Sequence, residues 1–267
     1  MQVSTLSIIC MAISAIVSIG LPITLFIVFY KKYNAKVVPM MLGVAGFVLF
    51  AMILESIVHL NVIDRFALKE KPLIYIIYAI FMAGVFEETA RFISFKILRK
   101  KYNGIETGLS YGVGHGGAEA ILLVGLSLIS AIVFCVMINT GNIEIITGKL
   151  QGQTLERMNA QLTTLTTTSP YLFLVGGLER VFAIIVHLSL SVIVFYSVYG
   201  CGKNKFLLYP LAIVLHAMID VPAAAMQTGI IKSVALVELS LLFEVAILAL
   251  IARYIHLRMK SKKQDFD

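Results

Sequence analysis

The sequence is poor in charge: aspartate, glutamate, lysine and arginine make up 14% of its 267 residues, whereas soluble domains contain about 25%. Tryptophan is absent, and hydrophobic residues reach 59% of the chain. Apolar runs of about 18 residues or more recur along the whole length, and each is long enough to cross ~30 Å of hydrocarbon as a helix. These features exclude an ordinary soluble globular protein and predict an all-α, polytopic transmembrane helical bundle.

Cysteine is also scarce. Cys10, Cys135 and Cys201 lack the spacing of metal ligands, so we expect buried thiols rather than a disulfide framework. No basic segment precedes the first apolar stretch, which is too long for the hydrophobic region of a signal peptide, so no cleaved leader is predicted. We find no internal repeat and no soluble domain, and we interpret residues 1–267 as a single integral-membrane domain.

Seven apolar segments are separated by polar breaks: 5–30, 37–60, 72–98, 108–139, 170–199, 206–228 and 231–256. The longest break, 140–169, is rich in threonine and glutamine, and either a plain loop or an interfacial amphipathic helix fits it. If the N-terminus lies outside, fourteen of the 22 basic residues fall in cytoplasmic segments and six on the outer side. The positive-inside rule therefore predicts an outer N-terminus, a cytoplasmic C-terminus and an extracytoplasmic 140–169 loop. The net charge of +7 then indicates orientation in the membrane rather than a nucleic-acid partner.

Several ionisable residues lie inside the predicted spans, where a charge costs at least ~2.5–3.5 kcal/mol and marks a functional candidate. From the third span to the sixth these residues are Glu87, Glu88 and Arg91; His115 and Glu119; Glu179, Arg180 and His187; and His216 and Asp220. Counted from the predicted cytoplasmic ends, the Glu pair and the three histidines fall at roughly 10–18 Å depth, at ~1.5 Å per residue. Residues from four helices therefore share one layer, as the members of a single site must.

The chemistry that such a layer supports is narrow. A neutral imidazole binds zinc or polarises a developing oxyanion, and a carboxylate beside it orients the ring or takes a proton from water. Arg91 lies within one helical turn of both Glu87 and Glu88, so it can keep one carboxylate ionised and leave the other free as a base. Glycines around His115 let a helix or a substrate backbone approach closely. The sequence thus predicts a water-activating hydrolytic site in the membrane that opens inward.

These residues resemble the motifs of a known group of intramembrane proteases. The segments Glu87-Glu88-Thr89-Ala90-Arg91, Tyr111-Gly112-Val113-Gly114-His115 and His216-Ala217-Met218-Ile219-Asp220 occur in the order and helical setting of the CAAX prenyl protease and bacteriocin-processing (PrsW-like) group. The chain is most similar to the YhfC family assigned to that group. The resemblance covers residues 72–228, which we take as the core of the active site.

The resemblance implies that one Glu of the pair, usually the first, activates water while His115 and His216 polarise the scissile carbonyl, with Arg91 and Asp220 completing the catalytic set. It implies a bacterial plasma-membrane enzyme acting on a membrane-embedded or lipidated peptide. Two features depart from the group. Arg91 lies three residues after Glu88, whereas the group usually has a spacing of four, and His187 is an additional intramembrane histidine. A zinc site of His115, His187 and His216, with Glu119 and Asp220 orienting the ligands, is therefore one alternative, and a metal-free glutamate mechanism is the other.

Other functions are compatible with the same residues. A proton- or ion-coupled transporter also needs buried Glu, His and Arg, although the sequence has neither the repeats nor the symmetric helix breaks of many transporters. A catalytically silent scaffold or immunity factor is a further alternative. We interpret Glu55 and His59 as interfacial, and we assign no role to Glu238 or Glu244 in the last span. Membrane lipids are the expected surroundings, and the sequence does not indicate an oligomeric state.

Overall fold

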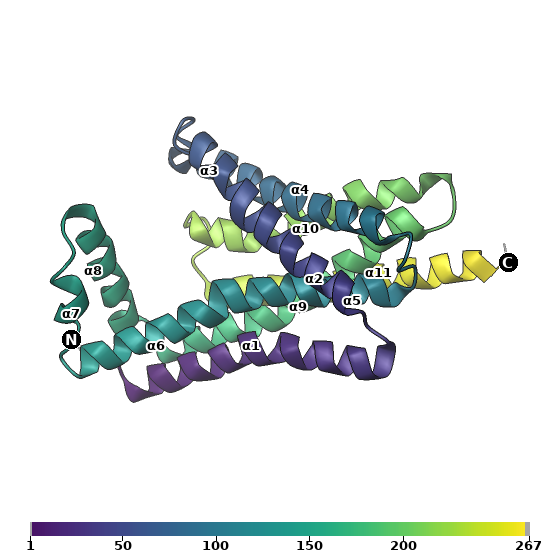
Figure 1. Cartoon of the computed structure of the whole chain (residues 1–267). Coiled ribbons are helices and arrows are strands. Elements are labelled where there is room, and N and C mark those ends of the chain that lie inside the picture. Colours follow the sequence, from purple (N-terminus) through teal and green to yellow (C-terminus); the bar gives the residue numbers. More distant parts are fainter. Residues whose placement is uncertain (1, 265–267) are drawn as a thin grey trace. The chain divides into compact units, whose positions relative to one another are not determined.

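The computed structural model describes residues 2–264. The side chains of Lys262 and Lys263, which are among the fourteen basic residues predicted to be cytoplasmic, lie outside the described part. The described chain is helical, and no β-strand occurs within it (Figure 1). Seven helical stretches are long and apolar enough to cross a membrane: Thr5–Tyr33, Val37–Val62, Pro72–Leu98, Ile105–Asn139, Pro170–Tyr199, Lys203–Gln227 and Val234–Ser261. The predicted all-α bundle with seven candidate spans is therefore confirmed.

Several spans are composite. The main helices are α1 (Thr5–Tyr33), α4 (Pro72–Leu98), α9 (Pro170–Tyr199), α10 (Leu208–Gln227) and α11 (Val234–Gln264). The second span joins α2 (Val37–Gly46), the π-helical η1 (Phe47–Glu55) and α3 (Ser56–Val62), and the fourth joins α5 (Ile105–Glu119), the π-helical η3 (Ala120–Gly125) and α6 (Leu126–Asn139). Short 3₁₀ turns, η2 (Leu68–Glu70) and η4 (Lys203–Leu207), precede α4 and α10. π-Helical turns are rare and often occur at functional sites.

The 140–169 segment contains two helices, α7 (Glu144–Thr147) and α8 (Gly152–Thr167). Of the two alternatives for this segment, the helix is the one that forms. Leu162 and Leu165 on α8 are buried in a small core with Met11, Cys135 and Ile138, while most of its threonines are exposed. An apolar stripe on an otherwise polar helix is sufficient to hold it against its neighbours.

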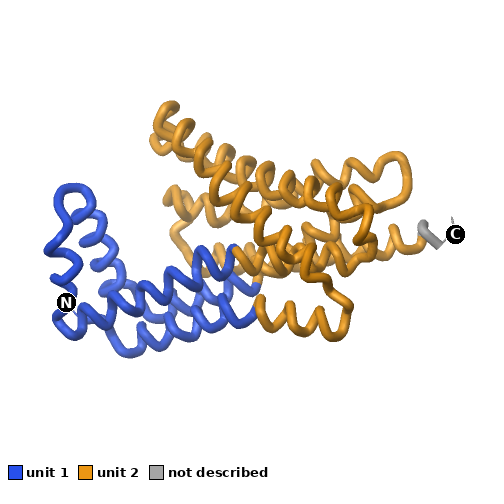
Figure 2. Tube along the Cα trace, viewed as in Figure 1, with its two compact units in different colours: residues 1–21, 119–181 blue, residues 22–118, 182–267 orange. Residues whose placement is uncertain are grey.

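The chain divides into two compact units (Figure 2). Unit 1 comprises residues 1–21 and 119–181, and unit 2 comprises residues 22–118 and 182–267. Inside unit 2, α4 packs against α10 and against α2 and η1. The main core of unit 2 is built from buried residues such as Phe95, Tyr111, Leu190 and Leu248. The three cysteines are free thiols, with Cys10 and Cys135 buried and Cys201 partly so.

Gly114 allows α5 to approach α2 closely. A Cβ at this position would collide with the backbone carbonyl oxygen of Met40, which cannot turn aside as a side chain does. We expect Gly114→Val to lower the free energy of unfolding by about 1–3 kcal/mol, as overpacking of a tight contact does. Thermal unfolding of the protein in detergent measures the change. Gly176→Val is the matched control, because nothing lies within 4 Å of the Cβ built there, and equal loss in both variants would contradict the proposed contact.

Candidate functional site

Four helices of unit 2 carry the candidate residues to one place. Glu87, Glu88 and Arg91 lie on α4, His115 on α5, His187 on α9, and His216 and Asp220 on α10. Glu88, Arg91 and His115 are fully buried, and Glu87, His187 and His216 nearly so. Charged groups are rarely buried unless they are paired. The contacts among these side chains therefore determine what the site can do.

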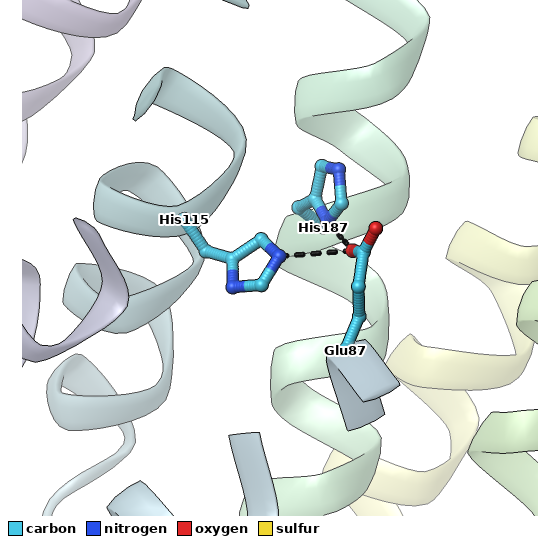
Figure 3. A group of neighbouring side chains, drawn as sticks. All are labelled: Glu87, His115 and His187. Carbon is cyan, nitrogen blue, oxygen red and sulfur yellow. Dashed lines mark hydrogen bonds and ion pairs between the residues drawn. The ribbon is translucent and has the colours of Figure 1, made fainter. Parts of the chain in front are cut away.

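Glu87 stands at the centre of the three histidines. Its Oε2 accepts a hydrogen bond from Nε2 of His115 at 2.9 Å (Figure 3). The same oxygen lies 3.8 Å from Nδ1 of His187 and 3.9 Å from Nε2 of His216. In the part of the chain that the structure describes, no Lys or Arg forms an ion pair with this carboxylate, and Arg91 pairs with Glu88 instead. Imidazole nitrogens from three different helices therefore surround a single carboxylate oxygen.

Glu88 has a different environment, although it is the next residue in the chain. Its Oε1 accepts hydrogen bonds from Nη1 of Arg91 and, at 2.7 Å, from Nδ1 of His216. Glu88 and Arg91 are both completely shielded from solvent. The guanidinium thus neutralises Glu88 and not Glu87. The spacing in the sequence left both pairings open, and the structure selects the one three residues apart.

The ring of His216 is fixed by the same contact. Because Nδ1 donates its proton to Glu88, Nε2 is left with a free lone pair in the neutral ring. That nitrogen faces Glu87 and lies 3.6 Å from Oδ2 of Asp220, one helical turn further along α10. A carboxylate bonded to one ring nitrogen, with the other nitrogen exposed to the reaction space, is the usual way to orient a functional histidine.

His187, the additional histidine, also lies in the cluster. Its Nδ1 accepts a hydrogen bond of 2.8 Å from Nη2 of Arg91, and its ring centre is 4.9 Å from that of His115 and 6.1 Å from that of His216. Arg91 therefore connects Glu88 to His187 as well. One guanidinium positions groups on two helices.

Aromatic and glycine residues hold His115 in place. Phe47, the first residue of η1, meets the His115 ring edge-on with 5.4 Å between ring centres. The Tyr111 hydroxyl lies 3.5 Å from Nδ1 of His115. A Cβ on Gly116 would lie 2.8 Å from the His187 ring. Gly114, whose Cβ would meet Met40, and Gly116, whose Cβ would meet His187, therefore allow close helix packing beside His115.

The donor set fits a divalent metal ion. One ligand atom each from Glu87, His115 and His187 lie within 4.8 Å of one another, and all three residues are buried. Zinc bonds of about 2.0–2.1 Å at tetrahedral angles separate ligands by roughly 3.3 Å. The 2.9, 3.8 and 3.9 Å contacts of Glu87 Oε2 bracket that separation. Glu87, His115 and His187 thus form the compact set, Nε2 of His216 lies 3.9 Å from the same Glu87 oxygen, and the site of three histidines stays a prediction.

Glu119 and Arg180 form a separate ion pair within unit 1. Nη1 of Arg180 donates to Oε1 of Glu119 at 2.7 Å, and Nη2 lies 3.7 Å from Oε2 of Glu179. The orienting role proposed for Glu119 beside His115 stays a prediction. The pair explains how two charges on neighbouring spans are accommodated.

The sequence reasoning missed two features. Phe47 carries no chemical signal of its own, and only the fold brings it to His115. Glu55 and His59, expected at the interface, are bonded to each other, His59 is also bonded to the Tyr78 hydroxyl, and Glu55 is only 7% exposed. Their spacing of one helical turn within an apolar span was the signal that could have identified them.

The family described as "YhfC intramembrane metalloprotease" matches residues 17–241 of the chain. The "Uncharacterized membrane protein YhfC" of Bacillus subtilis (strain 168) is 38% identical over 247 residues, which cover 89% of this chain and 92% of that protein. No solved structure matches the chain.

Proposed function

Because the chain belongs to the YhfC family of intramembrane metalloproteases, we propose that this multi-pass membrane protein is an endopeptidase whose general base is Glu87. The proposal places peptide-bond hydrolysis among the buried histidines of unit 2. It keeps the predicted kinship with the CAAX prenyl protease and PrsW-like group.

The observation that carries the proposal is that the two adjacent glutamates, Glu87 and Glu88, have different charged and polar partners. Glu88 is paired with Arg91, whereas Oε2 of Glu87 faces imidazole nitrogens of His115, His187 and His216. A general base needs a lone pair directed at the reaction space and not consumed by a permanent cation. Glu87 meets that requirement and Glu88 does not.

The other residues have positioning or electrostatic roles in this proposal. Glu88 holds His216 so that Nε2 is directed toward Glu87 and Asp220. His115 bonds to the base, and His216 as the imidazolium, with a proton on Nε2 as well, polarises the scissile carbonyl. Arg91 balances the charge of Glu88 and orients His187. Asp220 supports His216 from the following turn of α10.

In the alternative in which a metal ion is bound, Glu87 would be a ligand together with His115 and His187, with His216 beside them, instead of a free base, and zinc would supply Lewis acidity for water and carbonyl. Nδ1 of His187 accepts a hydrogen bond from Arg91, which orients this ring beside Glu87.

The proposed substrate is a membrane-embedded or lipidated peptide. A site enclosed by transmembrane helices is reached most directly from the bilayer, and membrane lipids are the proposed surroundings. The outer N-terminus, the cytoplasmic C-terminus and the bacterial plasma membrane belong to the same proposal.

Zinc binding tests the metal component without requiring a substrate. We expect the purified chain to bind about one zinc ion. His115→Ala or His187→Ala should weaken zinc binding more strongly than the loss of a residue that only orients a ligand, which typically costs about 10–100-fold in affinity. Titration with a competing chelator and metal analysis measures both. His256→Ala is the matched control, since His256 is bonded to Tyr196 at 2.7 Å in the same unit. Unchanged affinity in both site variants would favour the metal-free glutamate mechanism.

A further inference from the structure

Three cationic side chains of unit 2 line one cavity beside the connection between α9 and α10. The cavity has a volume of about 580 Å³, and Lys203, Lys205 and Arg258 form part of its wall. The two lysines lie on η4, between α9 and α10, and Arg258 lies in the last two turns of α11. Small-molecule sites typically have volumes of ~300–1,000 Å³. The cavity is therefore large enough for a ligand with several polar groups.

The cations of this cavity have no acidic neighbour in its wall. None of the described residues that line it is aspartate or glutamate. Lys203, Lys205 and Arg258 form no ion pair with any residue that the structure describes. Like charges that share a confined space repel one another, and a bound anion removes that repulsion while it accepts their hydrogen bonds. The charge of the cavity therefore favours an anionic ligand.

One of the three cations is held in place by the backbone. Nζ of Lys205 donates a hydrogen bond of 3.0 Å to the carbonyl oxygen of Val198, in the last turn of α9. An ammonium group has three N–H donors, so two remain for a ligand. Lys205 is half-buried, whereas Lys203 and Arg258 are exposed. A cation that is already positioned loses less side-chain entropy when it binds an anion.

The cavity also has an apolar wall and lies where spans end. Lys203 begins the sixth candidate span, and Arg258 lies within one turn of the end of the seventh, at Ser261. Span ends are at the level of phospholipid headgroups, where tyrosine is also enriched. Tyr254 is 61% exposed. The other apolar or aromatic side chains around it in the wall are Leu208, Ile255 and Met259.

We propose that this cavity binds the headgroup of an anionic phospholipid, with Lys203, Lys205 and Arg258 bonded to its phosphate. Basic pockets between transmembrane helices are typical sites for such headgroups. Free phosphate would engage the cations alone, whereas a lipid also places its glycerol and acyl chains against the apolar wall. The bound headgroup connects the turn between α9 and α10 to α11. This lipid site is independent of the proposed hydrolysis.

Cys201 provides a reporter that is already part of the cavity wall. The purified protein in an uncharged detergent is treated with N-ethylmaleimide, an uncharged thiol reagent, with and without phosphatidylglycerol. Phosphatidylcholine, inorganic phosphate and a soluble poly-glutamate peptide are the comparison probes. Cys10 and Cys135 are buried in unit 1, and peptide mass spectrometry measures the labelling of Cys201 separately from theirs.

Two variants of equal charge loss complete the experiment. Lys203→Gln/Arg258→Gln removes two exposed cations of the cavity and keeps the contact of Lys205 with α9. Lys31→Gln/Lys100→Gln removes two exposed cations that are not part of the wall. Each labelling rate is compared with the rate of the same variant without lipid, because nearby cations change the reactivity of a thiol.

We expect phosphatidylglycerol to slow Cys201 labelling by at least about fivefold in the natural sequence and in the control variant, because the bound lipid keeps the reagent from the thiol. Phosphatidylcholine should give no such protection, and the cavity variant should lose most of it. Equal protection by phosphatidylcholine, or equal protection of the cavity variant, would overturn the proposal. Inorganic phosphate or poly-glutamate protecting at a lower concentration than phosphatidylglycerol would also overturn it, by assigning the cavity to a free anion or to an acidic protein segment.

Discussion

Glu87→Gln is expected to reduce peptide cleavage by about 10²–10⁴-fold, the usual contribution of a general base. The amide keeps the size of the side chain and can still contact the histidines, but it cannot accept a proton from water. Glu88→Gln should cost less catalytically, because Glu88 orients His216 and does not face the reaction space. The two variants alter adjacent residues of the chain. We expect the cleavage rate to fall further in Glu87→Gln than in Glu88→Gln.

The measurement is single-turnover cleavage of a lipidated or membrane-inserted reporter peptide by the protein in bilayers. His216→Ala should resemble Glu87→Gln, since Nε2 of His216 faces the same oxygen. Glu70→Gln, at an exposed position in η2, is the control for general effects of losing a carboxylate. Full activity of Glu87→Gln, together with loss of activity in Glu88→Gln, would identify Glu88 and not Glu87 as the general base. Unchanged cleavage in all three site variants would remove the proposed site.

Arg91→Met is expected to destabilise the protein by about 3–5 kcal/mol, the cost of leaving a buried charge without its partner. Glu88 would lose its guanidinium in a place with no access to solvent. Within the described residues its other oxygen, Oε2, has no hydrogen-bond partner, so Glu88 would keep the hydrogen bond from His216 but lose its ion pair. His187 would also lose the donor to Nδ1. The effect should therefore be among the largest for a single substitution in unit 2.

Thermal unfolding in detergent measures this loss, and the double variant Glu88→Gln/Arg91→Met provides the decisive comparison. Removing both charges should recover much of the stability, since an apolar or neutral pair in a buried site is often tolerated better than half an ion pair. Lys96→Met, an exposed position on the same helix, controls for the substitution itself. If the double variant were as unstable as Arg91→Met, packing around the arginine rather than charge pairing would explain its burial.

Much of the fold follows directly from the sequence. The seven spans and the breaks between them depend on local hydropathy, because a helix in hydrocarbon satisfies its own backbone hydrogen bonds. Pro72 and Pro170 begin α4 and α9, as expected for a residue that fits the first helical turn. The pairing of His216 with Asp220 was also predictable, since residues four apart share one face of a helix. In each case the information lies within a few residues of chain.

The tertiary structure decided the questions that depend on distant contacts. Positions three and four residues after a glutamate are both on its helical face, so only the contacts of α4 with His115, His187 and His216 from other helices showed that Arg91 pairs with Glu88 while Glu87 faces the histidines. The contact of Phe47 with His115 likewise required the approach of η1 to α5. The sequence by itself determined that the chain is a seven-span helical bundle with ionisable residues in its interior. Which of those residues are neutralised and which stay available depends on side chains brought together from separate helices, and no local pattern encodes that.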